Sequence, residues 1–367
     1  MENIVASKWL EVGQYGQSVW YDNVARPAVR MGLLQRIIDE DAVTGGTSNP
    51  SIFAKSVEES GLYDDAIRAV PSSASAAEAF GPLWIEDIQA ACDVMLPVWE
   101  RTSGADGYIS IEVEANLANN TPNTVRRAHE LHAAVDRPNV MVKVPGTKEG
   151  IESFRQLTSE GVSINVTLLF SVERYHRIAE AYVAGIAQRH AAGKSVDGIQ
   201  SVASFFVSRI DSKVDALLPE GSPLRGKVAV ANAKLAYADV YQAVFEGVDW
   251  QPLAAAGANR QRPLWASTSM KNPAYSPTLY VDELIGPDTV NTVPDATLEV
   301  FRTMGNPASR ITEDVAGSRQ VMADLAAAGI DFAVVTRELE EEGVASFAKA
   351  YDGMLQAIQN RREAFAG

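Results

Sequence analysis

The sequence predicts an α/β fold, a (β/α)8 barrel of the TIM type, on three observations. Short β-rich apolar runs alternate with helical patterns, which is typical of βα units around a parallel sheet. Eight such runs are present, and eight parallel strands close a barrel. A chain of 367 residues suits one barrel with insertions. The expected strands lie at residues 18–23, 42–49, 107–114, 140–145, 161–170, 201–210, 263–268 and 289–297.

The segments between the strands predict the helices. RPAVRMGLLQRIIDE places Pro27 at a first helical position and spaces its aliphatic residues along one face. Thr121 is the expected N-cap of TPNTVRRAHELHAAV, and Ser171 that of the helix after the fifth strand. The low-complexity stretch 71–83 is too short for an interdomain linker.

We expect one domain over residues 1–367, with extra helices at three places. They lie at the N-terminus, between strands six and seven, and at the C-terminus. Residues 211–262 form the insertion, which is helical around KVAVANAKLAYADVYQAVF and loop-like afterwards. The helical C-terminal segment is expected to close over the barrel.

Composition excludes several classes of protein. An apolar fraction of 46% and a charged fraction of 22% are those of a globular protein. No apolar run is long enough to cross a membrane, and MENIVASKWLEVGQYG lacks the pattern of a secretory signal, so we expect a cytoplasmic protein. A net charge of −15 repels phosphate backbones, and without a basic patch we expect no nucleic-acid binding.

Potential metal ligands are sparse in this sequence. Cys92 is the only cysteine, which excludes an intramolecular disulfide and argues against a cysteine-based metal site. His129 and His132 are three residues apart on a predicted helix but lack a third ligand, and His176 and His190 fall on another helix. We therefore expect no metal.

Polar side chains lie inside the predicted strands, although both faces of a parallel barrel are covered. In YISIEVE and VMVKVP the alternation of side chains turns Glu112 and Lys143 toward the barrel interior. Other polar residues lie near the carboxyl ends of the strands, where barrel enzymes build their active sites. They are Asp22, Asn49, Asn165, Thr167 and Ser204.

Lys143 has two interpretations. Burial makes an ammonium costly and favours the free amine, which is the form that attacks a carbonyl to make a Schiff base. Carboxylates for the proton transfers are then available in Glu112 and Asp22. Alternatively, Lys143 forms a buried ion pair with one of them and has a structural role only.

Six motifs, in this order along the chain, together resemble the transaldolases, and most of all the longer bacterial type. The resemblance spans roughly residues 15–300 and agrees with the predicted barrel, with the lysine on strand four. Any one motif would be a weak signal alone. They are GGTSNPSIFAKS (45–56), ISIEVEANLANN (109–120), VMVKVPGTKEGI (140–151), INVTLLFSVERY (164–175), SFFVSRID (204–211) and WASTSMKNP (265–273).

The resemblance implies a role for each matching residue. Lys143 forms an iminium ion with a ketose phosphate, and Asp22 takes the proton from the C4 hydroxyl as the C3–C4 bond breaks. Glu112 works through a water molecule that Thr167 helps to hold. The residues implied in binding the substrate are Asn49, Asn165 and Ser204 for the dihydroxyacetone unit, Arg209 and Ser267 for the phosphate, and Phe206 as a further substrate-binding residue.

One motif departs from the family. Its better-known members have an arginine soon after the serine, in a motif like ASFRN, whereas this chain reads ASTSMKN. Lys271 is the expected replacement, without the two-pronged geometry of an arginine. Arg209 has a competing interpretation as an ion-pair partner of Asp211 or of a neighbour.

The implied reaction moves a dihydroxyacetone unit from sedoheptulose 7-phosphate to glyceraldehyde 3-phosphate, giving erythrose 4-phosphate and fructose 6-phosphate. It needs no metal or organic cofactor, and the chain is expected to be a monomer or a homodimer. The fructose 6-phosphate aldolase branch of the family has glutamine and tyrosine where this chain has Glu112 and Phe206. A barrel that only binds sugar phosphates or partner proteins is the alternative of another class.

Overall fold

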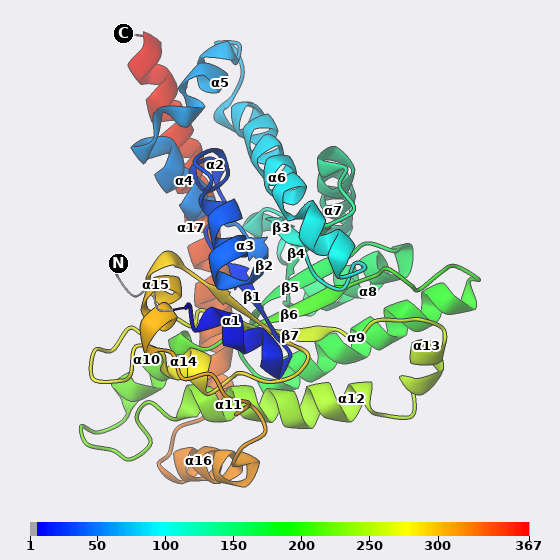
Figure 1. The fold of residues 1–367 in the computed structure, drawn as a ribbon, viewed down its shortest axis with the longest axis vertical. Helices are drawn as coiled ribbons and strands as arrows, with labels where there is room; N and C mark the ends of the chain where they lie inside the picture. Colours follow the sequence, from blue (N-terminus) through cyan, green and yellow to red (C-terminus); the bar gives the residue numbers. More distant parts are fainter. Residues whose placement is uncertain (1–5, 367) are drawn as a thin grey trace.

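Eight parallel strands in sequence order form a closed barrel, with β8 beside β1. The barrel lies at the centre of the molecule (Figure 1). The computed structural model describes residues 6–366, so the first five residues and the last of the expected domain lie outside the described part. Every predicted strand is present, which confirms the barrel. The strands are β1 (Gln17–Tyr21), β2 (Val43–Thr47), β3 (Ile109–Glu112), β4 (Val140–Pro145), β5 (Ile164–Leu169), β6 (Ser201–Phe206), β7 (Arg262–Ala266) and β8 (Thr289–Val293).

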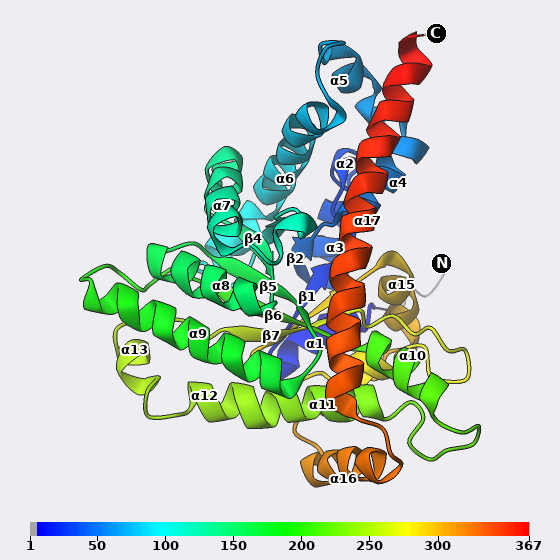
Figure 2. The ribbon, with the colours of Figure 1, turned by 180° about the vertical axis from the view of Figure 1, so that it is seen from behind.

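Helices follow the strands and cover the outside of the barrel (Figures 1 and 2). The short helix α1 (Trp9–Val12) precedes β1. After the first six strands come α2 (Arg26–Arg30), α3 (Leu33–Asp41), α4 (Pro50–Glu59), α5 (Asp64–Ala69), α6 (Ala76–Arg101), α7 (Thr121–Val135), α8 (Lys148–Glu160), α9 (Val172–Ala191) and α10 (Ser208–Leu217). The last part of the chain adds α14 (Leu279–Asp282), α15 (Asp295–Met304) and α16 (Val315–Ala327).

The expected insertion between strands six and seven is present and mostly helical. It contains α11 (Val228–Ala236), a π-helical segment at Tyr237–Gln242, α12 (Ala243–Phe245) and α13 (Gln251–Ala255). Figure 1 shows α11 and α12 as one nearly continuous rod beside α9. No helix among residues 6–366 combines the length and the apolarity that crossing a membrane needs.

Two local expectations were wrong. The helix predicted from Pro27 onward is two helices, because Gly32 has a left-handed backbone with φ of 75° and interrupts the first one. The N-cap of α7 is Asn120, whose side chain accepts a hydrogen bond from the Asn123 backbone, one residue earlier than Thr121. The low-complexity stretch 71–83, expected to be too short for an interdomain linker, runs into α6, where Ser75 and Glu78 form a capping box.

The C-terminal helix α17 (Phe332–Ala366) is 35 residues long and passes over the barrel, as expected. Figure 2 shows it running from α16 to α5 along one side of the molecule. Gly343 allows the close approach, because a Cβ there would lie 2.9 Å from the Leu168 side chain of β5. The helix thereby reaches the carboxyl ends of the strands from a distant part of the sequence.

Candidate active site

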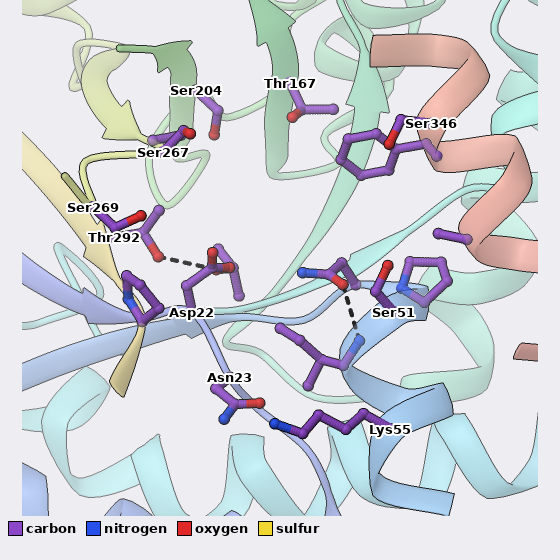
Figure 3. Close-up of a pocket in the computed structure, with 18 of the residues that line it drawn as sticks. Asp22, Asn23, Ser51, Lys55, Thr167, Ser204, Ser267, Ser269, Thr292 and Ser346 are labelled. Atoms are coloured by element: carbon purple, nitrogen blue, oxygen red, sulfur yellow. Dashed lines mark hydrogen bonds between the residues drawn. The ribbon is translucent and has the colours of Figure 1, made fainter. Parts of the chain in front are cut away.

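A cavity of about 740 Å³ opens at the carboxyl ends of the barrel strands. Figure 3 shows side chains reaching it from the strand ends, with Lys55 entering from α4 and Ser346 from α17. Because the strands are parallel, their carboxyl ends meet at one rim, so residues distant in sequence converge there. Nine of the eleven predicted site residues line the cavity: Asp22, Asn49, Lys143, Thr167, Ser204, Phe206, Arg209, Ser267 and Lys271.

Lys143 points into the barrel, as the strand alternation predicts. Register pairs it with Glu112 on β3 and with Asn165 on β5. Only 6% of the residue is exposed, yet it lines the cavity. Its Nζ lies 3.4 Å from Glu112 Oε2, an ion pair that lacks hydrogen-bond geometry. The structure therefore contains the ion pair of the structural interpretation, but with the nitrogen facing a cavity that a small molecule can enter.

Glu112 ends β3 and pairs in register with Lys143, but does not itself line the cavity. Burial raises the pKa of its carboxyl to about 7, against the opposing effect of the Lys143 charge. Oε2 takes part in no hydrogen bond within residues 6–366, and the same is true of the Thr167 hydroxyl on β5. A buried polar atom without a hydrogen-bond partner destabilises a folded protein by about 1–3 kcal/mol. Both oxygen atoms therefore favour a bound molecule that can form hydrogen bonds with them.

Asp22 follows β1 directly and is held by its neighbours at the rim. The Thr47 hydroxyl donates a hydrogen bond of 2.5 Å to Asp22 Oδ1, and Thr292 lies 3.0 Å from the same hydroxyl. Burial raises the pKa of the Asp22 carboxyl, while the Lys143 charge and the Thr47 hydrogen bond lower it. One lysine thus lies near the buried Glu112 carboxyl and the half-buried Asp22 carboxyl, a combination typical of sites that move protons near neutral pH.

Asn165 lies beneath the cavity and does not line it. Its amide donates to the Ser110 hydroxyl at 3.1 Å, and its carbonyl oxygen accepts from Ser204 at 2.7 Å. The residue is completely buried. This chain of hydrogen bonds fixes the rotamer of Ser204, whose side chain lines the cavity above.

Asn49 is the N-cap of α4 and lines the cavity. Its Oδ1 caps the helix by accepting a hydrogen bond of 3.1 Å from the Ile52 backbone. Pro50 follows at the first helical position, which fixes where the helix starts. Because the oxygen is engaged in the cap, the amide nitrogen is the part of Asn49 that is available to a ligand.

Arg209 is the best-placed cation at the rim. Its guanidinium lies over the Phe206 ring, 5.2 Å from the centroid, and has no ion pair or hydrogen bond within residues 6–366. Burial lowers its pKa below the usual value for arginine. The expected alternative, an ion pair with Asp211, is wrong, because the carboxylate of Asp211 accepts hydrogen bonds from the Ala229 backbone and the Tyr280 hydroxyl instead.

Ser267 and Lys271 lie in the loop after β7. Ser267 has a left-handed backbone, with φ of 55°, and its hydroxyl lies 2.9 Å from that of Ser208. Lys271 is exposed and reaches the same cavity. The loop therefore places a hydroxyl and a second cation in the cavity that Arg209 lines.

Sequence reasoning missed several residues of the cavity. Thr47 carried a usable signal, since it precedes Asn49 by two positions and so faces the same way. Lys55 lies in the GGTSNPSIFAKS motif but was not singled out, and its ammonium is 3.9 Å from Glu59. Phe347 and Ser346 carried no signal, because only the packing of α17 brings them to the site.

Potential metal ligands do not cluster in this structure. Among residues 6–366 no three histidine, cysteine, aspartate or glutamate side chains come together as a metal site would require. His129 lies outside the cavity, with its Nε2 2.6 Å from Glu160. Cys92 is buried, and burial raises the pKa of its thiol.

Comparison with known proteins shows the family of this chain. The family model described as Transaldolase/Fructose-6-phosphate aldolase matches residues 19–358. The transaldolase of Trichodesmium erythraeum is 41% identical over 98% of both chains. That of Saccharopolyspora erythraea is 45% identical over 94% of this chain and 95% of its own, and that of Thiobacillus denitrificans 44% identical over 95% and 98%. The chain belongs to the transaldolase/fructose-6-phosphate aldolase family and, within it, to the transaldolases, which are enzymes of the transferase class.

Proposed function

We propose that this protein transfers a dihydroxyacetone unit from sedoheptulose 7-phosphate to glyceraldehyde 3-phosphate through a Schiff base on Lys143. The products are erythrose 4-phosphate and fructose 6-phosphate, which places the reaction in the non-oxidative pentose phosphate pathway. The observation that carries the proposal is a buried lysine that faces a cavity between two carboxyl groups of raised pKa.

The chemistry begins at the Lys143 nitrogen. The free amine adds to the C2 carbonyl of the ketose phosphate, and loss of water leaves an iminium ion. Asp22 accepts the C4 hydroxyl proton while the C3–C4 bond breaks, and the bonding electrons convert the iminium into an enamine. The aldehyde erythrose 4-phosphate leaves. The enamine attacks the aldehyde carbon of glyceraldehyde 3-phosphate, Asp22 returns its proton to the new hydroxyl, and hydrolysis frees Lys143 and fructose 6-phosphate.

Glu112 assists the addition and loss of water. A carboxyl with a pKa of about 7 is present in both protonation states near neutral pH, as a group that both gives and takes protons must be. Glu112 Oε2 and the Thr167 hydroxyl make no hydrogen bond within residues 6–366, which supports a water molecule held by these two residues. We assign to that water the proton transfers of iminium formation and hydrolysis.

The polar wall of the cavity suits a dihydroxyacetone unit. Ser204, fixed from below by Asn165, and the amide nitrogen of Asn49 provide hydrogen bonds for hydroxyl groups. Ser267 and Lys271 join Arg209 in the proposed phosphate site. Because the chain carries a net charge of −15, local cations are needed to offset the long-range repulsion of sugar phosphates.

The transferase rather than the aldolase reaction is favoured by Glu112 and Phe206. The Phe206 ring packs against Phe170, with centroids 5.3 Å apart, and offers no hydroxyl to the cavity. The Phe206 side of the cavity thus presents no proton donor to the enamine, which favours transfer to an aldehyde acceptor over release of dihydroxyacetone. The cytoplasmic location and the monomeric or dimeric state remain predictions.

Borohydride trapping tests the proposed Schiff base. Incubation with fructose 6-phosphate and sodium borohydride is expected to reduce the iminium to a secondary amine, and mass spectrometry should find the added mass on the peptide that contains Lys143. A family member of known activity serves as the positive control. If that control is labelled and this protein is not, the proposed function is wrong.

Loss of the Arg209 charge is expected to weaken substrate binding. Arg209→Gln removes a charge-assisted hydrogen bond to phosphate, so KM for fructose 6-phosphate should rise about 10- to 100-fold with a smaller change in kcat. Lys271→Gln should raise KM less, because this exposed lysine is more hydrated than Arg209. Arg337→Gln is the matched control, since Arg337 also has no ion pair within residues 6–366 but lies outside the cavity. An unchanged KM in Arg209→Gln would remove Arg209 from the phosphate site.

A further inference from the structure

The C-terminal helix α17 places an aromatic ring beside the proposed reacting nitrogen. Lys143 Nζ lies over the ring of Phe347, 5.3 Å from its centroid. Phe347 also lines the catalytic cavity, next to Ser346 and Ala350 on the same helix. No other aromatic ring within residues 6–366 makes a cation–π contact with this lysine.

Contacts on both sides of α17 hold the ring in place. Glu340 pairs with Arg174 at the start of α9, at 3.0 Å. Lys213 of α10 pairs with two glutamates of α17, at 2.9 and 2.5 Å. Gly343 lies against the Leu168 side chain of β5, one helical turn before Phe347. These contacts fix the part of α17 that precedes Phe347.

The charge on Lys143 Nζ changes during the proposed reaction. The nitrogen is positive in the ammonium and in the iminium, and neutral in the free amine and in the enamine. The face of an aromatic ring attracts a cation and does little for a neutral group. A cation–π contact shifts the equilibrium between a positively charged and a neutral form of the nitrogen by about 2-fold at an exposed site and by roughly 30-fold at a desolvated one.

We propose that Phe347 is a catalytic residue that stabilises the positive charge of the iminium on Lys143, relative to the neutral enamine. The inference rests on the proposed Schiff-base reaction and adds a residue to it. The ring also favours the resting ammonium, so its benefit lies in the covalent intermediates and not in the formation of the nucleophile. An iminium held in this way is the form from which the product ketose is released by hydrolysis.

Two reagents separate the intermediates. Borohydride reduces the iminium, and ferricyanide oxidises the enamine. The initial rate of borohydride reduction divided by the initial rate of ferricyanide oxidation therefore reports the balance of iminium to enamine. The protein is loaded with fructose 6-phosphate, and the ratio is measured for the wild type and for variants at position 347. Because both rates are measured on protein already carrying the covalent intermediate, a change in KM does not affect the ratio.

Fluorinated phenylalanine at position 347 is the sharpest variant, because pentafluorophenylalanine keeps the ring shape and reverses the charge distribution of its face. We expect it to lower the ratio about 2- to 30-fold. Phe347→Leu should do the same, and Phe347→Tyr should keep the ratio within about 2-fold. Phe332→Leu, on the same helix but outside the catalytic cavity, is the matched control and should leave the ratio unchanged.

Two outcomes would contradict the role of Phe347, and a third would contradict the proposed function itself. A ratio that does not fall with the fluorinated ring would overturn the proposal, even if Phe347→Leu lowers it, because the role would then be one of shape. An equal fall in Phe332→Leu would also overturn it, since the effect would come from the helix. If the wild type forms no borohydride adduct at all, the proposed function itself fails.

Discussion

Replacement of Lys143 by alanine is expected to abolish turnover, with kcat lower by at least about 10⁴-fold. No other lysine in the described part of the cavity is buried. Lys55 and Lys271 are exposed and lie on α4 and in the loop after β7. Release of erythrose 4-phosphate from sedoheptulose 7-phosphate, and loss of the borohydride adduct, are the measurements. Retained turnover would mean that another amine is the nucleophile.

A folding control is needed because Lys143 pairs with a buried carboxyl. Removal of one partner of a buried ion pair costs about 3–5 kcal/mol when the other remains charged. Glu112 has a raised pKa and can take up a proton instead, which reduces that cost. Lys143→Met preserves the volume of the side chain and should fold, as circular dichroism and a melting curve would show. Lys148→Ala, at an exposed position on α8, should retain activity.

Replacement of Asp22 by alanine is expected to separate bond cleavage from iminium formation. Turnover should fall about 10²- to 10⁴-fold, because Asp22 is the carboxyl to which we assign acceptance of the C4 hydroxyl proton. Borohydride trapping of the first iminium should persist, since Asp22 acts after that intermediate forms. Single-turnover measurements of adduct formation and of aldehyde release compare the two steps.

Asp22→Asn is the matched variant for this prediction. It keeps an oxygen that can accept the hydrogen bond of Thr47 and so preserves the local geometry without the base. We expect it to behave like Asp22→Ala in turnover and to be closer to the wild type in stability. An equal loss of trapping and of turnover in both variants would show that the assigned role of Asp22 is wrong.

The strands were predictable because each carries its own signal. Parallel strands that are covered on both faces read as apolar runs, and all six residues of β4 are buried, Lys143 included. The alternation of side chains is a local property of an extended chain, so it also predicted that Glu112 and Lys143 face inward. Helix ends were less predictable. Several polar residues compete for the N-cap, and Asn120 takes the place expected for Thr121.

The sequence by itself determined the barrel, the inward lysine and, through six motifs, the family. Only the tertiary structure decided the distance from Lys143 to Glu112 and the position of Phe347 beside the lysine. It also decided that Asp211 accepts hydrogen bonds from other groups and forms no ion pair with Arg209. The physical reason is the separation along the sequence over which each effect acts. Periodicity and capping act over a few neighbouring residues, whereas a helix that begins at residue 332 meets a strand that begins at residue 140 only through packing across the whole barrel.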